Sequence, residues 1–126
     1  MDGEVKINDL FEKDASGKEL VEFSQKIARS LVDNRLTTNQ IRNLFGEVRQ
    51  IEALWRRDPT TALRRLVLLK PKMYYQVKRT PAVRGLQEVL DPAISEVEKA
   101  ENKDQAFQRF MDLFEAILAY HKAFAR

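Results

Sequence analysis

Residues 37–57 of the chain, TTNQIRNLFGEVRQIEALWRR, decide its fold. Thr37 stands three residues before Gln40, a spacing that lets the two side chains cap backbone N–H groups at the start of a helix. Six apolar residues then recur at helical spacing: Ile41, Leu44, Phe45, Val48, Ile51 and Trp55. Because these residues fall on one face of a helix, the stretch predicts a helix that buries that face against other elements.

The same helix carries a basic stripe beside its apolar face. Arg42, Arg49 and Arg56 are spaced seven apart, roughly 100° round from the centre of that face. Between residues 35 and 84 the chain has 12 Lys and Arg against 3 Asp and Glu, whereas the remainder has 10 against 16. A basic segment between acidic ends is typical of a polyanion-binding surface. Arginine stems also cover apolar surface on helix faces, and composition alone leaves both interpretations open.

The residues on either side of this stretch predict further helices. Residues 18–33 precede it and have apolar side chains at helical spacing. Asp58 and Pro59 follow it directly, and an N-cap residue before a proline predicts the start of a third helix. Pro71 should interrupt that helix, because a proline clashes with the preceding turn. Whether or not the helix resumes after this break, residues 70–79 should form an exposed shoulder.

Two more helices are expected in the second half of the chain. Thr80 and Pro81 repeat the cap-and-proline signal for a fourth helix, in which Pro92 predicts a kink or a restart. A polar link at residues 100–103 precedes the last helix, and Asp104 is a candidate cap for it. The apolar stripe of this last helix contains four phenylalanines, Phe107, Phe110, Phe114 and Phe124. Such a helix should form the centre of the core or a subunit interface.

No segment shows the two-residue alternation of a half-buried strand. We therefore expect an all-α fold, a compact bundle of about five helices with short connections. The chain has 126 residues, enough for one core and too few for two. Residues 17–126 should form a single helical-bundle domain. Residues 1–16 should be a flexible or weakly docked tail, with Leu10 and Phe11 as the side chains that dock.

The residue types argue against catalysis. The chain has no cysteine and one histidine, which excludes the common zinc sites and any cysteine nucleophile. His121 falls within the apolar stripe of the last helix, so we predict a packed, hydrogen-bonded side chain rather than a catalytic one. The four glycines are not clustered, which excludes a phosphate-binding loop. We therefore predict no enzymatic activity, no catalytic residue, no metal and no cofactor.

The sequence shows neither a signal peptide nor a membrane-spanning stretch. The N-terminus is acidic and mixed, without a basic region followed by an apolar run. No uncharged run approaches the length of about 20 residues that crosses a bilayer. We therefore expect a cytoplasmic protein without membrane contacts, and the lack of cysteine fits a reducing compartment.

The positive candidates for function are basic and aromatic side chains. The basic ones are Arg42, Arg49, Lys70, Lys72, Lys78, Arg79 and Arg84, and Met73, Tyr74 and Tyr75 lie among them. Cations hold phosphates, and tyrosine rings offer surfaces on which unstacked bases rest. One of the two tyrosines is expected in the core with its hydroxyl at the rim. Phosphate binding of this kind would depend on salt and be largely independent of RNA sequence.

Three elements of the sequence resemble a known family. They are TNQIR at residues 38–42, LKPK at residues 69–72 with Tyr75 and Arg79 after it, and FEAILAYHK at residues 114–122. Together they are similar to the small α-helical subunit of type III-A CRISPR effector complexes, the Csm complex. Their order and approximate spacing are kept from about residue 31 to residue 122, and the first thirty residues add nothing to the resemblance.

The resemblance implies a non-catalytic subunit of a ribonucleoprotein in antiviral defence. Members of the family line the minor filament in several copies, beside a repeated backbone subunit and a large polymerase-like subunit. They contact crRNA and target RNA through basic side chains directed at the RNA backbone. Carried over by position, the resemblance implies RNA-binding residues at Arg42, Lys70, Lys72, Tyr75 and Arg79, and the basic stripe adds Arg49. Tyr74 beside Tyr75 leaves open which ring faces RNA, and the isolated protein could form a homodimer.

Two classes of function remain open at this point. In the first, the basic segment is the RNA-contacting surface of a ribonucleoprotein subunit. In the second, the chain is a helical protein–protein interaction module without direct nucleic-acid contact, and its arginines only interact with solvent. A helix-turn-helix DNA-binding protein is a weaker third interpretation, because the turn at Asp58 and Pro59 lacks the usual glycine.

Overall fold

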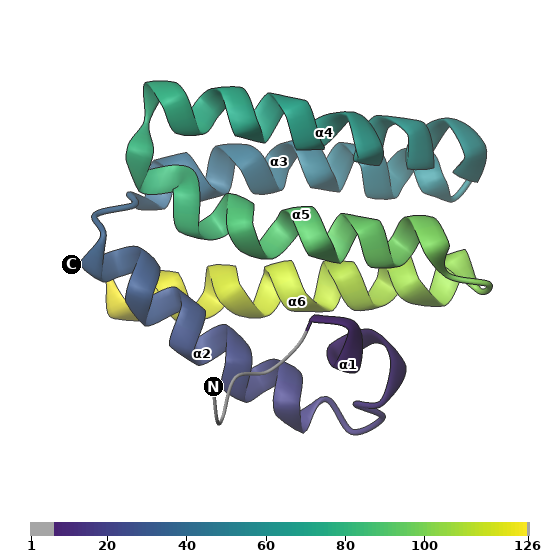
Figure 1. Cartoon of the computed structure of the whole chain (residues 1–126), viewed down its shortest axis with the longest axis horizontal. Coiled ribbons are helices and arrows are strands. Elements are labelled where there is room, and N and C mark those ends of the chain that lie inside the picture. Colours follow the sequence, from purple (N-terminus) through teal and green to yellow (C-terminus); the bar gives the residue numbers. More distant parts are fainter. Residues whose placement is uncertain (1–6, 126) are drawn as a thin grey trace.

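The computed structural model describes residues 7–125, and every regular element in this part of the chain is a helix (Figure 1). The elements are α1 (Ile7–Glu12), α2 (Lys18–Asp33), α3 (Thr38–Trp55), α4 (Pro59–Arg79), the 3-10 turn η1 (Pro81–Val83), α5 (Arg84–Lys99) and α6 (Lys103–Phe124). The predicted all-α fold is confirmed. Six α-helices are present in residues 7–125, which roughly fits the expected number of about five, and the short α1 forms within the stretch that was expected to be a tail.

The four long helices α3 to α6 lie side by side, and α2 crosses α6 at the edge of the bundle (Figure 1). α4 packs between α3 and α5, whereas α6 packs against α2, α3 and α5. This arrangement leaves one whole side of α4 without a neighbouring helix in the described part of the chain. α6, in contrast, packs against three long helices and contributes eight buried side chains to the core, while its remaining face is exposed.

Aromatic rings dominate the core around α6. The Phe114 ring meets the ring of Phe45 edge-on at 5.0 Å and that of Phe110 at 6.4 Å. Trp55 stacks on Phe107 with the ring centroids 4.2 Å apart. The phenylalanine-rich helix α6 therefore packs in the core of its own chain and connects the end of α3 to that core. A central place in the core was one of the two roles predicted for this helix, and a subunit interface was the other.

The caps that were predicted for α3 and α4 are confirmed. The Gln40 backbone N–H donates to Thr37 Oγ1 at 3.2 Å, and the Thr37 N–H donates to Gln40 Oε1 at 2.8 Å. Asp58 accepts from the Thr61 N–H at 3.2 Å at the start of α4. The hydrogen bonds with Thr61 hold the pKa of the Asp58 carboxyl below its ordinary value. Local sequence thus determines where both helices begin.

Replacing Thr37 with alanine should lower the free energy of unfolding by about 1 kcal/mol, because the Gln40 N–H then loses its partner. Chemical denaturation monitored by circular dichroism measures this change. Thr80→Ala is the matched control: Thr80 makes no side-chain capping bond, so its loss should change stability by less than about 0.5 kcal/mol. Equal effects of the two substitutions would contradict the assignment of the cap.

Two predicted helix boundaries were wrong. Pro71 does not interrupt α4, which runs from residue 59 to residue 79. Pro92 lies inside α5 without a restart, and the kink, the other outcome expected there, stays a prediction. Pro71 is exposed, so water can solvate the carbonyl group that loses its helical donor. Thr80 and Pro81 begin the short turn η1 rather than a capped α-helix.

The candidate cap of α6 was also wrong. Asn102 accepts from the Gln105 N–H at 3.0 Å and is the N-cap of α6. Asp104 instead accepts from Trp55 Nε1 at 2.8 Å, so its carboxylate ties the start of α6 to the end of α3. Because Trp55 and Asp104 are far apart in the sequence, no local sequence pattern predicts the hydrogen bond between them.

The segment that includes α1 is held to the bundle by polar and apolar contacts. Leu10 is fully buried, and Nη1 of Arg109 donates at 3.0 Å to the carbonyl oxygens of both Leu10 and Asp14. The Asp14 carboxylate accepts from the backbone of Leu20 at 2.9 Å and so caps α2. Residues 1–6, the rest of the predicted tail, lie outside the described residues.

Within residues 7–125, no three His, Asp or Glu side chains come together in a way that could hold a metal ion. In the same part of the chain, no helix has both the length and the apolar composition needed to cross a membrane.

Candidate nucleic-acid interface

The six predicted RNA-binding residues lie on two neighbouring helices but not on one surface. Arg42 and Arg49 belong to α3, and Lys70, Lys72, Tyr75 and Arg79 belong to α4. The packing of α3 against both α4 and α6 divides the set, since each flank of α3 faces a different neighbour. The structure therefore places these residues in three environments.

Arg49 lies on the flank of α3 that faces α6 and is engaged there. One of its guanidinium nitrogens is 2.9 Å from Glu52 Oε1, and the other is 3.4 Å from Glu115 Oε1 on α6. The guanidinium also lies 5.1 Å above the ring of Phe45. Arg42, seven residues earlier, lies on the same stripe and is exposed. Arg49 is thus exposed but paired with two carboxylates, while Arg42 is exposed without an acidic partner in the described part of the chain.

Lys70 and Lys72 bridge α4 to different neighbours. Lys70 Nζ is 2.9 Å from Glu98 Oε1 and 2.6 Å from Ser95 Oγ, both on α5. Lys72 pairs with Glu47 on α3. Two residues two positions apart on a helix point roughly 200° apart, which accounts for the opposite directions. The LKPK element therefore links three helices.

The outward side of α4 carries an exposed row of residues at helical spacing. We call it the outer stripe, and its members are Arg64, Leu68, Lys72, Tyr75 and Arg79, all exposed. The whole helix of 21 residues contains six Lys and Arg and no Asp or Glu. Within residues 7–125, Arg64 and Arg79 have no acidic partner. The outer stripe is consequently a positively charged surface with two apolar side chains in it.

The tyrosines depart from the prediction. Both are exposed, Tyr74 by 74% and Tyr75 by 62%, so the expectation that one of them belongs to the core was wrong. Met73, which was grouped with them, is fully buried. The physical reason is the continuous helix: residue 73 completes the buried row of α4, and residues 74 and 75 then fall on its solvent side.

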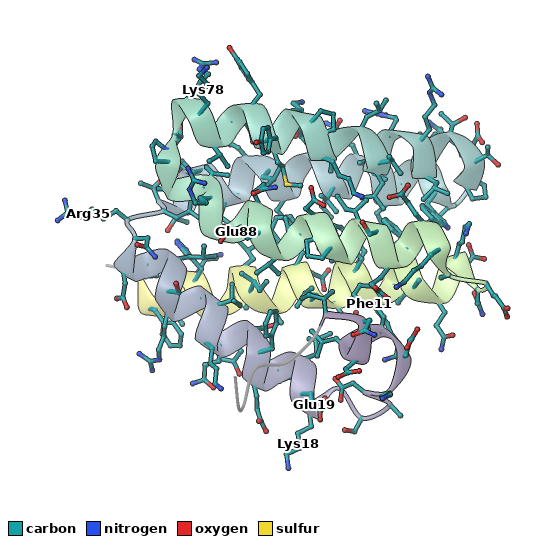
Figure 2. All side chains as sticks on the ribbon, in the orientation of Figure 1. Phe11, Lys18, Glu19, Arg35, Lys78 and Glu88 are labelled. Atoms are coloured by element: carbon teal, nitrogen blue, oxygen red, sulfur yellow. The ribbon has the colours of Figure 1, made fainter. Side chains whose placement is uncertain are left out.

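Further cations gather at the end of the bundle where α4 finishes. Figure 2 shows Lys78 and Arg35 at the same end of the molecule, with Lys18 at a distant edge. A polar hollow of about 340 Å³ lies between α3 and α4 at this end, and Gln40, Asn43, Gln76 and Arg79 are among its lining residues. The start of α3 and the end of α4 therefore meet at a polar corner, which Glu47 also lines.

Comparison with known families decides the identity of the chain. The family model described as Csm2 Type III-A matches residues 14–126. The chain belongs to the Csm2 Type III-A family. It is therefore a small subunit of the type III-A CRISPR Csm complex, as the resemblance implied. No curated protein and no solved structure gave a match.

The Csm2 Type III-A match is longer than the resemblance seen in the sequence, because it begins at residue 14 and not near residue 31. It includes all of α2 and the capping residue Asp14, and it leaves out α1. Residues 14–30 therefore belong to the family domain, contrary to the expectation that the first thirty residues add nothing.

The closing motif of this Csm2 family member serves packing. His121 is fully buried, and its Nε2 lies 2.7 Å from the carbonyl oxygen of Leu36, which confirms the predicted packed and hydrogen-bonded side chain. Tyr120 stacks on Phe124 at 5.8 Å, and the guanidinium of Arg29 lies 4.2 Å over the Phe124 ring. The end of α6 is thus tied to the loop before α3 by His121 of the motif, and to α2 by Phe124 just after the motif.

Sequence reasoning missed Arg64 and Leu68, the first two members of the outer stripe. The signal for them was present: positions 64, 68, 72, 75 and 79 follow the spacing of one helix face. The expected break at Pro71 divided this row into two parts, so the row was not recognised as one surface. Continuity through Pro71 is the feature that joins Arg64 to Arg79.

Proposed function

We propose that this chain is a non-catalytic small subunit that lines the minor filament of the Csm complex and contacts the crRNA–target RNA backbone through the outer stripe of α4. The proposal rests on one observation. α4 exposes one face to solvent, and the helix as a whole contains six Lys and Arg and no Asp or Glu. Phosphate oxygens are the natural partners of such a face, and contacts to them position RNA without reading its sequence. The role in antiviral defence follows from this assignment.

The predicted residues contribute unequally to the proposed surface. Arg79, Tyr75 and Lys72 lie on the outer stripe, while Arg42 offers a second contact on the far flank of α3. Lys72 and Arg49 have exposed ion pairs, and such pairs contribute only about 0–1 kcal/mol, so a phosphate can replace the carboxylate. Lys70, 24% exposed and held by α5, is the least available of the six.

The proposed partners are the crRNA and target RNA, the repeated backbone subunit, the large polymerase-like subunit and further copies of this chain. Single contacts of one subunit are weak, but several copies in a filament multiply them through avidity. The alternative is a helical protein–protein interaction module, and the exposed Leu68 in the outer stripe favours it. That module would use the same helix face for a protein partner.

Purification of the tagged full chain from its host tests the assignment. We expect a multisubunit particle that carries repeat-derived guide RNA, identified by mass spectrometry of the proteins and sequencing of the RNA. The untagged strain processed in parallel shows which proteins bind the resin alone. Recovery of the chain with unrelated proteins and without RNA would contradict the RNA-contacting role and favour the interaction module.

A further inference from the structure

A second feature of α4 lies beside the outer stripe, on the flank that faces α5. It is a shallow hollow of about 390 Å³ lined by Lys70, Pro71, Tyr74, Tyr75, Lys78 and Asp91, which we call the tyrosine groove. Five of its residues belong to α4, and Asp91 belongs to α5. The groove shares only Tyr75 with the outer stripe, so the two surfaces present different side chains to a ligand.

The two tyrosine rings contribute little to the packing of the fold, because most of each side chain is exposed. Tyr74 is 74% exposed and Tyr75 is 62% exposed, more than any other large apolar side chain in residues 7–125. Consecutive residues on a helix point about 100° apart, so one ring leans toward α5 and the other toward the outer stripe. Pro71, one turn earlier, lies between these two directions. Two adjacent exposed rings with charged residues beside them make this flank of α4 a candidate binding site.

The charges around the groove favour an anionic ligand with a flat apolar part. Lys78 follows Tyr74 by one helical turn and has no acidic partner within residues 7–125. Asp91 is the one acidic residue among those that line the groove, and its Oδ1 lies 3.9 Å from Lys70 Nζ, which offsets its charge. The groove thus combines two exposed rings with one available cation.

We propose that the tyrosine groove binds an unpaired nucleotide of RNA, with its base stacked on Tyr74 or Tyr75 and its phosphate at Lys78. Exposed rings beside cations are how proteins hold single-stranded nucleic acid, since every base has a face that can stack. A base inside a duplex has both faces covered by its neighbours, so only an unpaired nucleotide can enter. The inference rests on the proposed contact of α4 with RNA and adds a preference for unpaired positions.

Two RNA probes of equal phosphate content per strand test the groove on the isolated full chain. They are a fluorescein-labelled 12-nucleotide oligouridylate and a blunt RNA duplex of 12 base pairs, followed by fluorescence anisotropy. The double variant Tyr74→Leu with Tyr75→Leu keeps apolar bulk and removes the rings. We expect it to bind the single strand about 5- to 100-fold more weakly and the duplex within about twofold of the original chain.

The double variant Tyr74→Phe with Tyr75→Phe is the matched control, because it keeps both rings and removes only the hydroxyl groups. It should bind the single strand within about twofold of the original chain. Both tyrosines are exposed, so neither double variant should alter the circular dichroism spectrum or the unfolding midpoint. A loss in the phenylalanine variant as large as in the leucine variant would overturn stacking as the mechanism.

Other outcomes separate this inference from the proposed function. If the original chain binds the duplex and the leucine variant binds the single strand as tightly as the original chain does, the groove inference is wrong. The proposed function is not contradicted by that result. If the original chain binds neither probe in low salt, the groove inference fails, and the purified particle then decides the proposed function independently. Loss of the leucine variant from that particle, with unchanged single-strand affinity, would assign the groove to a protein partner instead.

Discussion

Replacing Phe114 with alanine should lower the free energy of unfolding by about 3–5 kcal/mol. The side chain is fully buried, and its ring lies between Phe45 of α3 and Phe110 of α6. Truncation removes both aromatic contacts and leaves a cavity that the surrounding helices can fill only in part. Denaturation in urea, followed by circular dichroism, measures the loss as a shift of the midpoint.

Tyr75→Ala is the control for this substitution, because it removes an aromatic ring of similar size from the surface. It should change the free energy of unfolding by less than about 0.5 kcal/mol. Phe114→Leu keeps most of the volume and should fall between the two, so the series remains informative if the alanine variant is poorly folded. A cost below about 1 kcal/mol for Phe114→Ala would contradict the central position of α6.

The helices that the sequence predicts well are those whose limits depend on neighbouring residues. Thr37 with Gln40 and Asp58 with Thr61 act over three positions, so a local pattern contains the whole interaction. The buried rows of α3 and α6 are equally local, since helical periodicity alone determines which side chains share a face. These parts of the fold can be predicted from the sequence because the interactions that determine them join residues close together in the chain.

The break expected at Pro71 shows where local reasoning fails. A proline inside a helix costs about 3 kcal/mol. Five residues of α4 are nevertheless buried at unbroken helical spacing across it: Ala62, Leu66, Leu69, Met73 and Val77. Their burial against α3 and α5 offsets the cost of the proline, since a single buried Leu or Met contributes about 1.5–3 kcal/mol. Tertiary packing therefore overrides the local signal.

The candidate RNA-binding residues show the same contrast between what the local sequence indicates and what depends on tertiary packing. Charge composition identifies the basic segment without a structure, because the count of charges depends on the sequence alone. The ion pairs of Lys72 with Glu47 and of Arg49 with Glu115 join residues 25 and 66 positions apart, and no local pattern contains them. Which cations remain available for RNA is therefore a property of the packed bundle, and it moves the candidate surface from α3 toward α4.

Reversing two charges of the outer stripe should strongly weaken the binding of an RNA duplex. The double variant Arg64→Glu with Arg79→Glu alters two exposed cations that have no acidic partner within residues 7–125, and it leaves the tyrosine groove intact. Each phosphate contact contributes about 0.7–0.9 to the slope of log K against log salt, so the slope should flatten by about 1.4–1.8. In 0.1 M salt this corresponds to about 25- to 60-fold weaker binding. Anisotropy titrations of the RNA duplex at four salt concentrations measure both quantities.

The control reverses two lysines of α2, Lys18→Glu with Lys26→Glu, which are exposed and lie away from α4. Both double variants change the net charge by the same amount, so a nonspecific effect of charge would alter their RNA binding equally. A contact through the outer stripe predicts a flattened slope for the α4 variant alone. Arg49→Glu is less suitable, because it would place a third carboxylate beside Glu52 and Glu115 and destabilise the fold. Equal slopes for the two double variants would contradict RNA binding by the outer stripe and favour a protein partner on that face.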